Sequence, residues 1–198
     1  MKEFFAFLTV TFFSLNVYSQ CNETKIREFA RNEYPSDSKM QDYIYNKQLS
    51  ACKYMTTVAD IEVKEFSVNE YPSDYSMQEY TYDKQLAAKN YLKTVTDSEV
   101  KEFSVNEYPS DYSMQKYTYD KQLAAKNYLK TVTDSEVKGI AYREYPNDYS
   151  MQKYTYDKQL SAKDYMATVT NASAKAQAKR EYPNDYSMQK YIYDKLVY

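Results

Sequence analysis

The stretch EYPSDYSMQEYTYDKQL, residues 70–86, decides the fold. Its opening Glu-Tyr-Pro recurs every 37 residues, starting at Glu33, Glu70, Glu107, Glu144 and Glu181. A fixed period of this length is typical of repeat architectures, in which each unit stacks on its neighbours. Residues 66–102 and 103–139 differ at only two positions, so the diverged first, fourth and fifth copies are the more informative ones.

Each repeat is expected to form two helices. Pro72 disfavours helical backbone at the residue before it, so a short helix ends near Glu70. Asp74 can cap the next helix by accepting a hydrogen bond from a free backbone N–H. No Gly or Pro interrupts residues 75–94, which predicts a long helix of about 18 residues, or about 27 Å. Thr96 and Glu99 have the spacing of a capping box, which predicts that another short helix begins there.

The long helix has apolar residues on two faces. At 100° per residue, Met77, Tyr80, Ala87, Ala88, Tyr91, Leu92 and Val95 share one stripe, and Tyr75, Tyr82 and Leu86 lie nearly opposite. This pattern places Tyr80 and Tyr91 in the core and Tyr82 between repeats, and it favours hydrogen bonds between repeats for Gln78 and Gln85. Such a helix must pack on two sides.

The expected fold is therefore all-α, with tandem 37-residue helix hairpins forming an α-solenoid. A compact helical bundle of the same hairpins is the alternative. A single domain of about four and a half units is expected over residues 20–198. Its turns fall at Tyr34, Tyr71, Tyr108, Tyr145 and Tyr182.

The amino-terminal residues are typical of a signal peptide. Lys2 precedes an apolar run from Phe4 to Leu15, and Val17-Tyr18-Ser19 offers a cleavage site. We expect residues 1–19 to be removed and the mature protein to be secreted, periplasmic or at the cell surface. The run is shorter than the roughly 20 residues that span a bilayer, so no transmembrane segment is expected after cleavage.

The two cysteines, Cys21 and Cys52, lie on either side of the Tyr34-Pro35 turn at similar distances along the chain. An antiparallel hairpin would bring them side by side, and an exported chain meets an oxidising compartment. A Cys21–Cys52 disulfide is predicted, with two free thiols as the alternative. Later repeats carry Lys89, Lys126 and Lys163 at the position of Cys52, which indicates a residue near the surface. Two cysteines without histidine leave too few ligands for a metal site.

The composition narrows the class of function. The formal net charge of -2 gives no reason to expect a nucleic-acid partner. No His is present, and no nucleophile–base pair is evident, so we expect a non-enzymatic protein without a cofactor. The leading hypothesis is a scaffold that binds a protein or glycan partner, and the alternative is a self-associating structural or adhesive surface protein. The 26 tyrosines offer rigid contact area, and the first choice for partner binding is the set at the start of each long helix: Tyr75, Tyr112, Tyr149 and Tyr186.

The segment from Pro72 to Gln78, continued by Tyr80 and Tyr82–Gln85, resembles short helical segments of exported or envelope-associated bacterial proteins whose function is uncharacterised. The resemblance covers the long helix of each repeat and names no family. It implies no activity and no site. The chain does not match tetratricopeptide repeats, which have a 34-residue period and a Gly where the helices cross.

Overall fold

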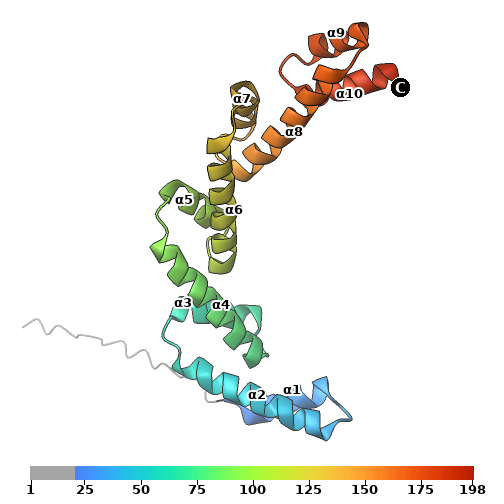
Figure 1. Ribbon diagram of the computed structural model, residues 1–198. Coiled ribbons are helices and arrows are strands. Elements are labelled where there is room, and N and C mark those ends of the chain that lie inside the picture. The colour runs from blue at the N-terminus through green and yellow to red at the C-terminus, as the bar shows by residue number, and fades with distance from the viewer. Residues whose placement is uncertain (1–20) are drawn as a thin grey trace, which may run out of the picture. The chain divides into compact units, whose positions relative to one another are not determined.

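The protein is described from a computed structural model that covers residues 21–198 (Figure 1). The predicted signal peptide, residues 1–19, lies outside the described residues. Within residues 21–198 the chain forms ten α-helices and no strand. The short helices are α1 (Glu23–Glu33), α3 (Ile61–Glu70), α5 (Ser98–Glu107), α7 (Ser135–Glu144) and α9 (Ala172–Glu181). The long helices are α2 (Ser38–Thr57), α4 (Tyr75–Thr94), α6 (Tyr112–Thr131) and α8 (Tyr149–Thr168), and α10 (Tyr186–Val197) is a shorter copy. The predicted all-α fold of tandem helix hairpins is confirmed.

Each short helix ends at the glutamate before Tyr-Pro. Tyr108 caps α5, and its backbone N–H still donates to the Ser104 carbonyl at 3.2 Å. Pro109 follows, and its ring restricts the backbone of the residue before it, so the helix stops here. The start of α5 corrects the capping-box prediction. Asp97, not Thr96, is the cap, because its carboxylate accepts from the Val100 N–H at 3.2 Å and the helix begins at Ser98.

Each long helix starts at an aspartate cap, as predicted. Asp111 accepts from the Met114 N–H at 3.0 Å, and Asp74 and Asp148 make the same bond one repeat away. The carbonyl of Tyr108 accepts a hydrogen bond from the Gln115 side chain at 2.7 Å, which ties the turn to the second turn of α6. The same bond recurs between Gln78 and Tyr71. The turn is therefore held by side chains present in every copy.

The buried stripe of the long helices differs from the predicted one. In α4 the buried residues are Gln78, Tyr82, Gln85, Ala88 and Leu92, which recur at helical spacing on one face. Tyr80, expected in the core, is 61% exposed, and Ala87 is also exposed. The prediction was wrong because two of the five buried residues are glutamines, which a stripe of apolar residues leaves out.

The helices group into two compact units, and the boundary between them, at Asp83 and Lys84, falls inside α4. In the first unit, Cys21 and Cys52 form the predicted disulfide, with their Cα atoms 5.9 Å apart. The bond joins Cys21, two residues before α1, to α2. Cys52 packs with Ile26, Ala30 and Tyr45 in a small core. It is 3% exposed, so the expectation that this position lies near the surface is wrong.

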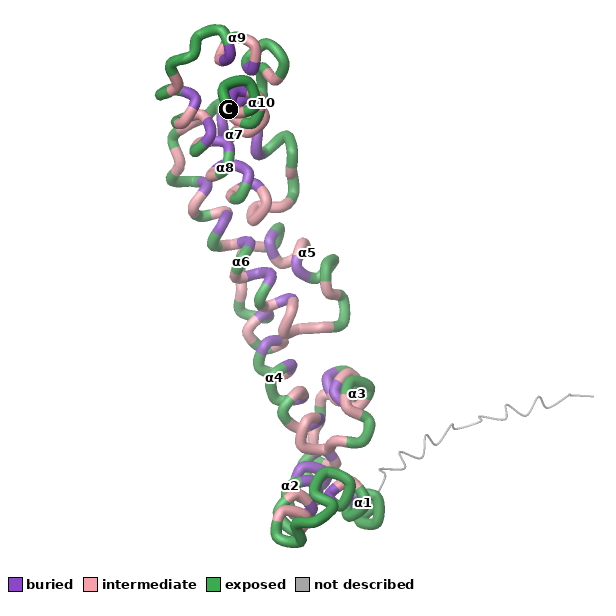
Figure 2. The backbone as a smooth tube through the Cα atoms, turned by 90° about the vertical axis from the view of Figure 1, so that its right-hand side faces the viewer, coloured by how far each residue is buried: buried purple, intermediate pink, exposed green. Residues whose placement is uncertain are grey.

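In the second unit the core is divided into similar clusters, one for each repeat. One cluster joins Leu129 of α6, Val137 and Ala141 of α7, and Tyr156 of α8. Each cluster thus draws on a long helix, the short helix that follows it and the next long helix. Figure 2 shows short buried stretches recurring along these helices and alternating with exposed ones. A single hairpin has no complete core, so each repeat depends on its neighbour for burial.

Among residues 21–198, no helix has both the length and the apolar character needed to cross a bilayer.

Candidate functional site

The repeats place their tyrosines in five series, each with its own environment. The turn tyrosines, whose backbone groups form hydrogen bonds at the helix ends, are Tyr34, Tyr71, Tyr108, Tyr145 and Tyr182. The helix-start tyrosines, which are the predicted binding residues, are Tyr75, Tyr112, Tyr149 and Tyr186. The outer tyrosines are Tyr43, Tyr80, Tyr117, Tyr154 and Tyr191. The buried tyrosines are Tyr45, Tyr82, Tyr119, Tyr156 and Tyr193. The bridging tyrosines are Tyr54, Tyr91, Tyr128 and Tyr165.

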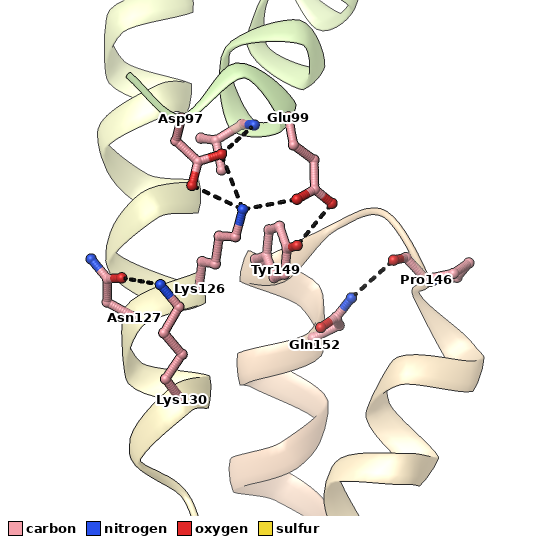
Figure 3. Close-up of polar contacts among 9 residues, drawn as sticks. Asp97, Glu99, Lys126, Asn127, Lys130, Pro146, Tyr149 and Gln152 are labelled. Carbon is pink, nitrogen blue, oxygen red and sulfur yellow. Dashed lines mark hydrogen bonds and ion pairs between the residues drawn. The ribbon is translucent and has the colours of Figure 1, made fainter. Parts of the chain in front are cut away.

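The helix-start tyrosines are half-buried, and Tyr149 and Tyr186 form hydrogen bonds with earlier repeats. The Tyr149 hydroxyl donates to Glu99 at 2.8 Å, and the Lys126 ammonium lies 5.1 Å from the centre of its ring (Figure 3). Tyr186 bonds to Glu136 at 2.7 Å in the same way. Burial, and secondly the bond to Glu99, raise the pKa of Tyr149. These tyrosines therefore connect repeats, and their part in partner binding stays a prediction.

Lys126 lies at the centre of this contact. Its ammonium forms ion pairs with Asp97 and Glu99, each at 2.8 Å, as Figure 3 shows. Lys163 pairs with Asp134 and Glu136 at 2.7 and 2.9 Å. These lysines occupy the repeat position that Cys52 occupies in the first copy. The disulfide of the first repeat and the ion pairs of the later repeats therefore form at the same position of the repeat.

Because of these ion pairs, we expect the stability of the fold to decrease at acidic pH. Hydrogen bonds from Lys126 hold the pKa values of Asp97 and Glu99 below their ordinary values, and Lys163 does the same for Asp134 and Glu136. A lowered folded-state pKa stabilises the fold above the unfolded-state pKa, and this stabilisation is lost as pH falls through the folded-state value.

We expect the thermal midpoint to fall between about pH 6 and about pH 3, across the carboxylate range. The double variant Lys126→Gln, Lys163→Gln should lose less over the same interval, as followed by circular dichroism. The ion pairs would have no such role if the variant and the parent lost the same amount.

Each bridging tyrosine contacts a buried tyrosine of the next long helix. The Tyr128 hydroxyl donates to Asp157 of the next long helix at 2.5 Å, and its ring meets Tyr156 edge-on with centroids 6.3 Å apart. The hydrogen bond to Asp157 is the main reason that the pKa of Tyr128 rises to about 12. Tyr82 confirms the prediction that it packs between repeats, since its oxygen accepts from the Asp60 N–H at 3.2 Å. Tyr91, expected in the core, is half-buried and bonded to Asp120.

Gln85 confirms the prediction of hydrogen bonds between repeats. Its side-chain N–H donates to Asp111 at 2.7 Å, and its oxygen accepts from the Ser113 N–H at 3.1 Å. Both ends of the amide are thereby satisfied, which is what allows a glutamine to be 3% exposed. Gln78, in contrast, bonds within its own repeat to the Tyr71 carbonyl.

Within the described residues, the outer tyrosines form no hydrogen bond and no ring contact of the kind that the other tyrosines make. All five are between 58% and 61% exposed.

Nine positions of the repeat carry the same residue in all five copies. In the second copy they are Glu70, Tyr71, Pro72, Asp74, Met77, Gln78, Tyr80, Tyr82 and Lys84. Within residues 21–198, neither Tyr80 nor Lys84 forms a hydrogen bond or an ion pair, and both are exposed. Glu70 is also exposed, at the end of the short helix.

Identity among the five copies could have marked Tyr80 and Lys84 from the sequence alone. Sequence identity does not distinguish these two residues from others that are equally invariant but serve the turn, the cap or the core: Tyr71, Asp74, Gln78 and Tyr82. Only the hydrogen-bond partners in the structure separate the two groups.

No protein-family model, no curated protein and no solved structure matches this chain.

Proposed function

We propose that the protein is a non-enzymatic scaffold that binds a protein or glycan partner through its outer tyrosines. One observation carries the proposal: an exposed tyrosine recurs in every copy although nothing in the described structure binds it. The other four series each have a packing or hydrogen-bonding role, which the turn tyrosines perform through their backbone groups. An exposed residue kept in all five copies without such a role is better explained by an external partner.

The chemistry of tyrosine supports this role. Its ring offers a large, rigid contact area at a low cost in conformational entropy, and its hydroxyl can donate or accept a hydrogen bond. In the second unit, Tyr117, Tyr154 and Tyr191 occupy equivalent positions on α6, α8 and α10. These three helices pack successively. A partner that extends along them can therefore meet one such ring on each helix.

Two further observations support a non-enzymatic and exported protein. The carboxylates that could have served a hydrolase have structural roles, since Asp74 caps α4 and Asp83 accepts from the Tyr54 hydroxyl at 2.5 Å. The Cys21–Cys52 disulfide fits an oxidising location, such as the cell exterior or a periplasm. The proposed scaffold therefore acts outside the cytoplasm.

The test begins with a screen of residues 20–198 against a glycan array and against extracellular protein fractions. A variant with alanine at Tyr117, Tyr154 and Tyr191 is then compared with the parent on every partner found. We expect its affinity to fall at least about tenfold, because aromatic anchors carry much of a binding energy. The matched control places alanine at Asn90, Asn127 and Asp164, which are exposed positions on α4, α6 and α8.

Circular dichroism should show that both variants keep the parental helix content and thermal midpoint. Unchanged affinity of the tyrosine variant for every partner would refute the proposed face. A third variant with Phe at Tyr112, Tyr149 and Tyr186 tests the helix-start tyrosines as binding residues, because it keeps the rings and removes the hydroxyls.

A further inference from the structure

We infer that each contact between successive long helices of the second unit forms a subsite for one carboxylate of a linear acidic polysaccharide. The outer tyrosine beside it would stack on a sugar ring. This inference rests on the proposed function, because it names the chemical class of the partner that the outer tyrosines meet.

A recess between α4 and α6 is the first observation. It has a volume of about 280 Å³ and is lined by Lys84, Ala87, Ala88, Ser113 and Lys116. The side chains of Ala87 and Ala88 are too short to fill this recess. Within the described residues, the hydroxyl oxygen of Ser113 is buried and has no hydrogen-bond partner. Lys84 has no ion-pair partner there either, whereas Lys116 is paired with Asp120 at 2.7 Å.

The same groups recur at the next two contacts. Between α6 and α8 the equivalent residues are Lys121, Ser150 and Lys153, and between α8 and α10 they are Lys158, Ser187 and Lys190. The hydroxyls of Ser150 and Ser187 also lack a partner within residues 21–198. Lys153 and Lys190 are again paired, with Asp157 and Asp194. Each contact therefore offers one unpaired ammonium and one unpaired hydroxyl.

These two groups suit a carboxylate. An ammonium forms a charge-assisted hydrogen bond with a carboxylate oxygen, and a serine hydroxyl can donate to the other oxygen once rotation about χ1 turns it from its buried position toward the ligand. Tyr117 and Lys121 are four residues apart on α6, so they lie on the same face. The same pair recurs as Tyr154 with Lys158. A sugar ring resting on the tyrosine would thus bring its acidic group near the lysine one helical turn away.

The repetition favours a polymer over a folded protein. Identical subsites at regular intervals match a ligand that presents the same group at regular intervals, and linking several weak sites raises the total affinity. A folded protein would present a different group to each subsite. Nucleic acid is the other repetitive anion, but it carries a phosphate on every nucleotide and is bound by strongly basic grooves. The chain has a net charge of -2 and offers one unpaired lysine per contact, so it does not form a strongly basic groove of this kind.

The test measures binding of residues 20–198 to three probes by isothermal titration calorimetry: alginate oligosaccharides, neutral dextran and oligo-dT. We expect alginate to bind at least about tenfold more tightly than dextran, with the preference weakening as the salt rises from about 0.05 M to about 0.5 M. The variant Lys84→Gln, Lys121→Gln, Lys158→Gln should lose this preference. The control variant Lys93→Gln, Lys130→Gln, Lys179→Gln removes the same charge elsewhere and should keep the preference.

A second variant, with alanine at Ser113, Ser150 and Ser187, should bind alginate less tightly while keeping the parental thermal midpoint, since it removes hydroxyls that bond nothing within the described fold. Equal binding of alginate and dextran would overturn the inference, and so would an unaffected lysine variant. Tighter binding of oligo-dT would assign the subsites to nucleic acid instead. A partner whose binding needs the outer tyrosines but not these lysines would overturn the inference alone, and the proposed function would stand.

Discussion

Replacing Gln122 with leucine is expected to lower the free energy of unfolding by about 2–4 kcal/mol, because it leaves buried polar groups unsatisfied. The Gln122 side chain, 3% exposed, donates to Asp148 at 2.7 Å and accepts from the Ser150 N–H at 3.1 Å. Leucine has a similar size but can do neither. Chemical denaturation followed by circular dichroism measures the loss.

The neighbouring variant Lys121→Ala is the control, because Lys121 is exposed and forms no bond within the described residues. Its effect should stay within about 0.5 kcal/mol, as for most surface substitutions. A Gln122→Leu protein as stable as the parent would show that this amide does not hold successive long helices together. The equivalent variant Gln159→Leu should behave in the same way, since Gln159 bonds to Asp185 and Ser187.

Removing the disulfide by the double variant Cys21→Ser, Cys52→Ser should cost about 3–4 kcal/mol in the first unit. The bond closes a chain segment with a sequence separation of 31 residues, and in the loop-entropy model such a cross-link restricts the unfolded chain by roughly this amount. Serine at Cys52 also places a hydroxyl among Ile26, Ala30 and Tyr45. A lower denaturation midpoint in the double variant measures the effect.

The reductant dithiothreitol provides the matched control. It should destabilise the parent and leave the double variant unchanged, because the variant has no disulfide to lose. A single alanine variant at Val137, which is 0% exposed, should leave the response to dithiothreitol intact, since Val137 lies in the second unit. An equal response to dithiothreitol in the parent and the double variant would contradict the assigned role of the bond.

The sequence was sufficient to predict the order of the helices, the positions of their ends to within about one residue, and the disulfide. Those features depend on local signals: the Tyr-Pro turn, the aspartate caps and the spacing of two cysteines about one turn. The sequence analysis placed the cap of α5 at Thr96, one residue before the observed cap, Asp97. Both side chains can accept a hydrogen bond at a helix start, so the sequence alone did not decide between them.

The faces of the long helices could not be predicted from hydrophobicity. Tyr80 and Tyr82 are chemically identical and two residues apart, yet one is 61% exposed and the other 3% exposed. What separates them is the burial of Gln78 and Gln85 on the side of Tyr82, and these glutamines are buried because specific backbone and aspartate groups of neighbouring turns satisfy them. That information lies in the three-dimensional contacts, so the exposed series became visible only in the structure.

The glutamine contact also bears on how this chain can change over generations. Gln48 bonds to Asp74 and the Ser76 N–H, and Gln85 makes the same two bonds to Asp111 and Ser113. Deleting residues 66–102 would therefore bring Gln48 to an aspartate and a serine of the same kind. Recombination between the near-identical copies can add or remove whole 37-residue units while reusing the same interface, so selection can tune the number of outer tyrosines, the proposed binding positions, without rebuilding the protein.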